Sequence, residues 1–187
     1  TLVTGVQTCA LPISVLFTSN SIEKTYLALV RGIAPSFAYI DHPLVEELDK
    51  MTDKKVSQLK PAQSASTTFH RLGYAEIPFS VDKYATTRYS LVKCLPHTGR
   101  KHQIRRHLKF ISHPIIGDAK HGKGIHNRFF HDHYTCSGLF LCATNTAFTH
   151  PVTGEAITIT APLSEDFSRI IKQLPWSEPL AENILLT

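Results

Sequence analysis

The sequence predicts an α+β fold in which a mixed, largely antiparallel sheet is flanked by helices. Segments with the alternation of strands outnumber segments with a helical period, and the two kinds do not alternate regularly, as a parallel α/β sheet would require. The chain has 187 residues, 42% of them hydrophobic, which corresponds to about one domain with enough apolar mass for a core.

Four segments have the pattern of strands. The first, KTYLALVRG (24–32), alternates loosely between apolar and polar residues and ends at a glycine. The next two, STTFHRLGYAEI (66–77) and TTRYSLVKCLP (86–96), are rich in Thr, Tyr, Phe and Val and have a period of two. The fourth predicted strand is AITITAP (156–162).

The clearest helical period follows the third of these strands. Ile104, Leu108 and Ile111 are spaced i, i+4 and i+7 and form one apolar stripe, which predicts a helix over 102–111. Thr98 is placed to cap this helix at its N-terminus.

The remaining segments predict shorter elements. SEDFSRIIKQL (164–174) begins with a capping serine and predicts a helix. The polar segment 41–55 predicts an exposed turn with a short helix. The His-Asp-His segment 131–133, with Cys136 nearby, is a single cluster, whereas a structural zinc site usually draws on two ligand pairs. The sequence therefore favours a polar surface loop there over a metal site.

The first residues have the pattern of neither a strand nor a helix. Val3–Ser14 contains no charged residue, and Pro12 would break any element that preceded it. Back-translated, this segment matches a common sequencing-library adapter read in frame. We therefore expect 1–14 to be non-native and to add nothing to the core, and natural sequence to be missing upstream. Residues 15–176 then form one domain and 177–187 a tail.

The cysteines and the hydropathy restrict the class of protein. Outside the prefix, Cys94, Cys136 and Cys142 are scattered, and no C-x-x-C pair occurs. This pattern argues against a zinc ribbon or a disulfide framework and in favour of a reducing compartment. No apolar run approaches the ~20 residues of a membrane helix. We expect a monomeric cytoplasmic protein with no membrane partner.

A strongly basic stretch lies in the middle of the chain. The formal net charge is +5, and no Asp or Glu occurs between Tyr84 and Gly117. Solvated surfaces usually mix charges of both signs, whereas a surface of one sign neutralises phosphates and releases counterions. The stretch therefore favours a polyanion-binding surface over a merely solvated helix face. The residues predicted to form this surface are Arg88, Arg100, Lys101, His102, Arg106 and Lys109.

Four motifs, in order, resemble the RluA family of pseudouridine synthases. They are KTYLALVRG, TTRYSLVKCLPHTGRKHQIRRHL, HPIIGDAKHG and THPVTGEAITITAP, and the resemblance as a whole covers 16–176. PLVEELDK and the continuous TGRKHQIRRHLKFISHPIIGDAKHG are most similar to the branch that modifies tRNA. The resemblance implies the pseudouridine synthase catalytic fold and the isomerisation, with no cofactor or metal, of a uridine in the acceptor or T-stem region of tRNA. The basic surface would then contact RNA.

The resemblance also implies three catalytic residues. Tyr26 matches the K-x-Y tyrosine, which stacks on the target base and helps to remove the proton from its carbon. Arg105, in H-Q-I-R, matches the basic residue that pairs with the nucleophilic aspartate and keeps it ionised. Ile104 matches the apolar residue that lines the base pocket. Asp118, in I-I-G-D, is expected to close an Asx-type turn and not to be catalytic.

One expected residue has no match in this sequence. The family nucleophile is an aspartate in an H-R-L-D-x-x-T-S-G motif, which the chain lacks. In the family this motif precedes the K-x-Y tyrosine by more residues than precede Tyr26 here, so we expect a truncated and inactive chain. The alternative is a non-catalytic RNA-binding protein that keeps the fold. A nucleotide-binding protein is disfavoured because no Gly-rich phosphate loop follows any strand.

Overall fold

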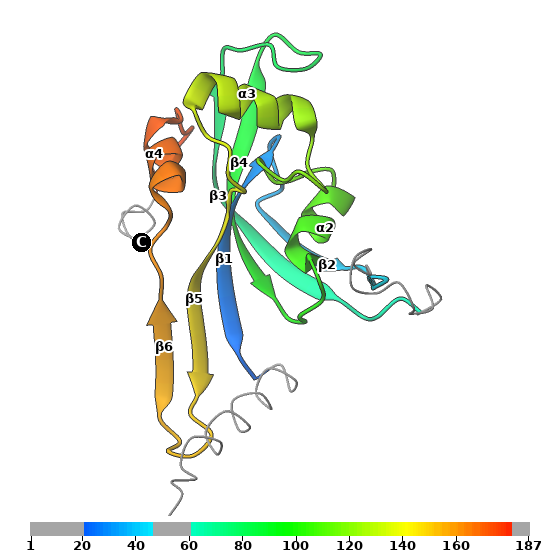
Figure 1. The fold of residues 1–187 in the computed structure, drawn as a ribbon, viewed down its shortest axis with the longest axis vertical. Helices are drawn as coiled ribbons and strands as arrows, with labels where there is room; N and C mark the ends of the chain where they lie inside the picture. Colours follow the sequence, from blue (N-terminus) through cyan, green and yellow to red (C-terminus); the bar gives the residue numbers. More distant parts are fainter. Residues whose placement is uncertain (1–20, 47–60, 181–187) are drawn as a thin grey trace, which may run out of the picture.

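The computed structural model of the chain describes residues 21–46 and 61–180. Its strands form one six-stranded sheet in the order β2-β3-β4-β1-β5-β6 (Figure 1). Every neighbouring pair is antiparallel, and three helices accompany the sheet in the described ranges, which confirms the α+β class. The elements are β1 (Glu23–Arg31), β2 (Phe37–Asp41), β3 (Ser66–Ile77), β4 (Thr87–Pro96), α2 (Gln103–Phe110), α3 (Gly124–Tyr134), β5 (Leu141–Thr149), β6 (Ala156–Thr160) and α4 (Glu165–Gln173).

The elements with a clear period in the sequence are confirmed. β1, β3, β4 and β6 match the four predicted strands, and α2 and α4 match the two predicted helices. The serine expected to cap α4 does so, because Ser164 Oγ accepts a hydrogen bond from the backbone N–H of Phe167 at 3.3 Å. An extended N-cap residue with a side-chain oxygen satisfies a backbone donor that the first helical turn leaves without a partner.

Thr98 does not cap α2, so that prediction is wrong. The N-cap residue of α2 is His102, which has a left-handed backbone (φ 56°) and makes no side-chain cap. Thr98 Oγ1 instead accepts a hydrogen bond from the backbone N–H of Ser66 at 3.1 Å and donates one to Gln103 Oε1 at 2.7 Å. The turn before α2 is therefore held by β3 and not by a local capping motif.

The helix α3 replaces the surface loop predicted around 131–133. Its sequence, GIHNRFFHDHY, contains few residues of high helix propensity. The helix forms because Phe130, which is 1% exposed, packs edge-to-face against Tyr89 and Phe140, with ring centroids 5.0 and 5.5 Å apart. Tertiary burial thus overrides a weak local preference.

Two strands are absent from the sequence-based prediction. β2 is a five-residue edge strand, and β5 is rich in threonine; both form through backbone pairing, β2 with β3 and β5 with β1. Asp41, expected to open an exposed turn, is the last residue of β2. The short helix expected after it falls largely on 47–60, and the prefix 1–14 also lies outside the described residues.

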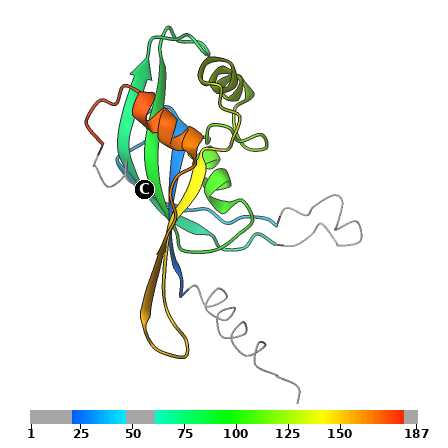
Figure 2. The same cartoon turned by 60° about the vertical axis from the view of Figure 1, so that its left-hand side comes forward.

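The two ends of the sheet differ in what covers them. In Figures 1 and 2, α3 and α4 lie towards one end, and the β5–β6 hairpin extends from the other. Phe140, just before β5, makes edge-to-face contact with Phe130 of α3 and with Phe167 of α4, which joins both helices to the core. None of the helices in the described ranges has the length and apolar character to cross a membrane.

Candidate active site

The three residues predicted to be catalytic line one open pocket. This pocket has a volume of about 250 Å³ and lies between β1 and the start of α2. Tyr26 comes from β1, and Ile104 and Arg105 come from the first turn of α2. Antiparallel pairing places Tyr26 between Cys94 of β4 and Ala143 of β5, in the middle of the sheet. The fold thus brings together residues that are far apart in the sequence.

Tyr26 and Ile104 form apolar parts of the wall. Tyr26 is half-buried, and this burial raises the pKa of its phenol above the ordinary value of 10.0. The phenol is therefore protonated at neutral pH, so it offers a ring face and a hydrogen-bond donor. Ile104 is 7% exposed and belongs to the hydrophobic core as well as to the pocket.

Arg105 is held in place by a buried carboxylate. Its Nε donates to Asp118 Oδ2 and its Nη2 to Asp118 Oδ1, both at 2.7 Å. The side chain of Asp118 is 1% exposed, and that of Arg105 is 18% exposed. Such a bidentate pair fixes the plane of the guanidinium as well as its position.

Asp118 also closes the turn that the sequence predicts for it. Its Oδ1 accepts hydrogen bonds from the backbone N–H groups of Lys120 and His121 at 2.9 and 2.8 Å. Burial alone would raise the pKa of Asp118, but the hydrogen bonds from Arg105 and from these two backbone groups lower it to about 2. The carboxylate is therefore ionised at neutral pH, and each of its oxygens accepts at least one hydrogen bond.

The partner of Arg105 lies just outside the acid-free stretch of the sequence. That stretch ends at Gly117, and the next residue supplies the counter-charge. Sequence reasoning identified Asp118 as a turn residue and did not pair it with Arg105. The signal was weak because thirteen residues separate the two side chains and the turn between them is irregular.

Gln103 is a second residue that sequence reasoning missed. It is 4% exposed and precedes Ile104 at the start of α2. Its Nε2 donates to the carbonyl of Ser66 at 2.9 Å and to Thr67 Oγ1 at 3.0 Å. Its Oε1 accepts from Thr98 Oγ1 at 2.7 Å and from the backbone N–H of Arg100 at 3.0 Å. These four bonds fasten the pocket wall that contains Arg100 to β3.

Part of the predicted basic surface lies at this pocket. Arg100 and His102 line it, next to Arg105. Lys101 is an exposed neighbour in the same turn, and Lys109 is exposed on α2. Among the described residues, no cluster of three or more His, Cys, Asp or Glu side chains could hold a metal ion.

The other two predicted basic residues, Arg106 and Arg88, are not among those that line this pocket. Arg106 Nη1 donates to the carbonyl of Val45 at 2.8 Å, which ties α2 to the segment after β2. Arg88, near the start of β4, lines a different pocket at the C-terminal end of β1. Arg88 therefore lies at a different pocket from Arg100 and His102.

Comparison with known proteins identifies the family. The profile of the RNA pseudouridylate synthases matches residues 2–110. The chain is 44% identical over 168 residues to the tRNA pseudouridine synthase C of Vibrio cholerae, covering 90% of this chain and 69% of that protein. It is 47% identical over 160 residues to the protein of the same name from Haemophilus ducreyi, covering 86% and 65%. The chain thus spans about two thirds of the length of these relatives.

Two solved structures share the fold. Human RNA pseudouridylate synthase domain containing 4 aligns with a TM-score of 0.63 at 24% identity, over 89% of this chain and 67% of that one. Human RNA pseudouridylate synthase domain containing 1 aligns with a TM-score of 0.60 at 24% identity, over 80% and 58%. Together with the family profile and the bacterial relatives, these matches show that the chain belongs to the RluA-type RNA pseudouridylate synthase family.

Proposed function

We propose that this chain is part of an enzyme that converts a uridine in the acceptor or T-stem region of a tRNA to pseudouridine. The observation that carries the proposal is the convergence of Tyr26, Ile104 and Arg105 on one pocket. The names of the bacterial relatives support tRNA as the RNA that is modified.

The pocket is suited to a base that has been flipped out of an RNA helix. Flipping costs a few kcal/mol of stacking and pairing, which contacts in the pocket must offset. Tyr26 offers a ring for stacking, and Ile104 and Leu141 offer apolar contact. Arg100 and His102 at the same pocket are suited to the phosphates on either side of the flipped base.

We propose further that the 187-residue chain binds RNA but does not convert its uridine to pseudouridine. The sequence has no H-R-L-D motif, and the nearest buried carboxylate, Asp118, already accepts hydrogen bonds from Arg105 and from two backbone N–H groups. A carboxylate engaged in this way is a poor nucleophile, because attack on a uridine would require it to leave these donors.

A chimera tests this proposal. It joins the family's H-R-L-D segment to residues 15–187, and its pseudouridine formation in a tRNA transcript is compared with that of the 187-residue chain. We expect turnover by the chimera and none by the chain alone at high enzyme concentration, measured as tritium release from labelled uridine. A folded chimera that binds tRNA but forms no pseudouridine would favour the non-catalytic RNA-binding protein instead. Clear turnover by the chain alone would make Asp118 the first residue to mutate.

RNA binding by the exposed basic residues should depend on salt. Replacing Lys101 and Lys109 with Gln should weaken binding of a tRNA transcript and reduce the slope of log K against log salt. The expected reduction is about 0.7–0.9 for each phosphate that the protein no longer neutralises. Fluorescence anisotropy at several salt concentrations measures both quantities.

The control for this experiment is Lys172→Gln. Lys172 is exposed on α4, away from the candidate active site, and its replacement removes the same kind of charge. The protein with Lys101→Gln and Lys109→Gln should have a smaller salt slope than the unmodified chain. Lys172→Gln should leave the slope unchanged. Equal slopes in all three proteins would contradict the assignment of this surface to RNA.

A further inference from the structure

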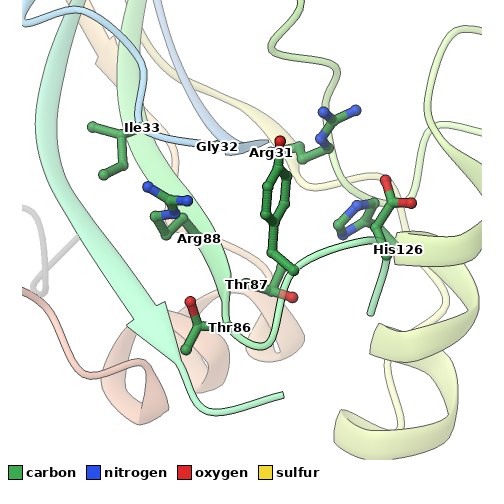
Figure 3. Close-up of a pocket in the computed structure, with 9 residues that line it drawn as sticks. Arg31, Gly32, Ile33, Thr86, Thr87, Arg88 and His126 are labelled. Atoms are coloured by element: carbon green, nitrogen blue, oxygen red, sulfur yellow. The ribbon is translucent and has the colours of Figure 1, made fainter. Parts of the chain in front are cut away.

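A second pocket lies at the C-terminal end of β1, away from the candidate active site. Arg31, the last residue of β1, lines it five residues after Tyr26, which is roughly 17 Å along an extended strand. Because five is an odd number, strand alternation directs the side chains of Tyr26 and Arg31 to opposite faces of the sheet. Figure 3 shows Arg31, Arg88 and His126, which come from β1, β4 and α3, among the residues that line this pocket.

Two guanidinium groups give this pocket an excess of positive charge. Within the described part of the chain, no hydrogen bond or ion pair engages the side chain of Arg31 or of Arg88. Asp82, the carboxylate among the residues that line the pocket, is paired with the ammonium of Lys123, and Glu76, directly opposite Arg88 on β3, accepts a hydrogen bond from Thr86 Oγ1. The pocket therefore has more cations than anions, and like charges in proximity are unfavourable without a further anion between them.

A buried histidine at the same pocket has a polar atom without a partner. His126 is 2% exposed, and among the described residues its Nε2 is the one buried side-chain nitrogen or oxygen that makes no hydrogen bond. Its Nδ1 lies 3.1 Å from the hydroxyl of Tyr89. When the hydroxyl donates to Nδ1, the proton of the ring is on Nε2, which is then a hydrogen-bond donor. A buried ring nitrogen without a partner is unfavourable, and His126 is one of the residues that line the pocket.

The surrounding backbone is fixed before any ligand binds. Thr87 Oγ1 donates to the carbonyl of Phe79 at 2.7 Å and accepts from the N–H of Val81 at 3.3 Å, which anchors the loop between β3 and β4. Gly32, with φ +83°, donates its N–H to the carbonyl of Arg88 at 2.7 Å. The left-handed conformation of Gly32 turns the chain at the point where β1 ends. The two arginines are thus held together by backbone contacts.

We propose that this pocket, which we call the Arg31–Arg88 pocket, binds a phosphate group. The two guanidinium groups supply several N–H donors for the acceptor oxygens of a phosphate, and His126 lines the same pocket. The pocket has a volume of about 130 Å³. This space is large enough for a phosphate group. The phosphate is either a backbone group of bound RNA or a small phosphate ligand.

The first experiment titrates inorganic phosphate into the ¹⁵N-labelled 187-residue chain at constant ionic strength, with chloride as the exchanged anion. Long-range ¹H–¹⁵N spectra of the histidine rings report on His126. We expect its resonances to shift and saturate. Arg31→Gln combined with Arg88→Gln should weaken phosphate binding at least tenfold, because each removes a charge-assisted hydrogen bond. Arg128→Gln, which removes an exposed charge from the same helix as His126, is the matched control and should leave binding unchanged.

The second experiment identifies the source of the phosphate. It compares the salt dependence of tRNA binding by the unmodified chain and by the Arg31→Gln, Arg88→Gln protein. A slope reduced by about one unit would identify an RNA phosphate, and an unchanged slope with saturable phosphate binding would identify a small phosphate ligand. This RNA experiment rests on the proposed function, whereas the phosphate titration does not.

The titration can overturn the proposal on the unmodified chain alone. If the His126 resonances do not respond to phosphate, or respond without saturation, the pocket is not a phosphate site. Equal phosphate affinity in the doubly substituted and unmodified proteins would lead to the same conclusion.

Discussion

Replacing Asp118 with Asn should lower the free energy of unfolding by about 3 kcal/mol. The substitution removes the carboxylate that pairs with the largely buried Arg105 guanidinium, and removing one partner of a buried pair typically costs about 3–5 kcal/mol. The lower end of this range applies because the side chain of Arg105 keeps 18% exposure. Urea unfolding followed by circular dichroism measures the change.

Two comparisons separate the buried pair from a general charge effect. Asp166→Asn breaks an ion pair of the same 2.7 Å length, Arg169–Asp166, whose side chains are 40% and 51% exposed. Its effect on stability should be much smaller, because exposed ion pairs contribute little. Arg105→Gln combined with Asp118→Asn should lower the free energy of unfolding by less than the sum of the two single substitutions. Equal losses for Asp118→Asn and Asp166→Asn would contradict the structural role given to Asp118.

The same pair should make the protein sensitive to acid. The pKa of Asp118 is about 2 in the folded protein, below the ordinary carboxyl value of 3.8. A depressed folded pKa means that the unfolded state takes up the proton first as the pH falls. The stability due to this group is therefore complete above about pH 4 and is lost between about pH 4 and 2. In the Asp118→Asn protein this part of the pH dependence should be absent.

Replacing Tyr26 with Phe in the chimera should reduce pseudouridine formation about a hundredfold or more. The substitution keeps the ring that lines the pocket and removes only the hydroxyl, which is the group suited to take part in proton transfer. Affinity for tRNA should change little, because stacking depends on the ring. Tritium release measures the turnover and anisotropy measures the binding.

Tyr74→Phe is the matched control for this change. Tyr74 is also a half-buried tyrosine on a strand of the same sheet, and it does not line the candidate active site. Its replacement should leave turnover near that of the unmodified chimera. Equal turnover by the Tyr26→Phe and Tyr74→Phe proteins would show that the hydroxyl of Tyr26 takes no part in the reaction.

The sequence predicted those elements whose periodicity is strong within a few residues. β3 and α2 are examples, because alternation and an i, i+4, i+7 stripe can be recognised locally. α3 and β5 could not be predicted in this way. Phe130 stabilises α3 through rings on β4 and before β5, and β5 forms by pairing with β1, which is more than a hundred residues away in the chain.

The residues of the candidate active site were likewise predicted only in part from the sequence. The motifs that contain Tyr26, Ile104 and Arg105 identified residues that line one pocket. They did not identify Gln103, which makes four hydrogen bonds, two of them to Ser66 and Thr67 of β3. The acid-free stretch placed Arg88 with the other basic residues, although it lies at a second pocket at the C-terminal end of β1.

By itself, the sequence determined the α+β class, the family resemblance and the identity of the residues at the pocket. Only the tertiary structure decided that Arg105 pairs with Asp118 and that Arg88 lies near Arg31 and His126. The physical reason is the distance along the chain over which each kind of interaction acts. Secondary structure follows from side-chain periods over a few residues, whereas an ion pair or an unsatisfied donor depends on which distant side chains the packed sheet brings within about 3 Å of each other.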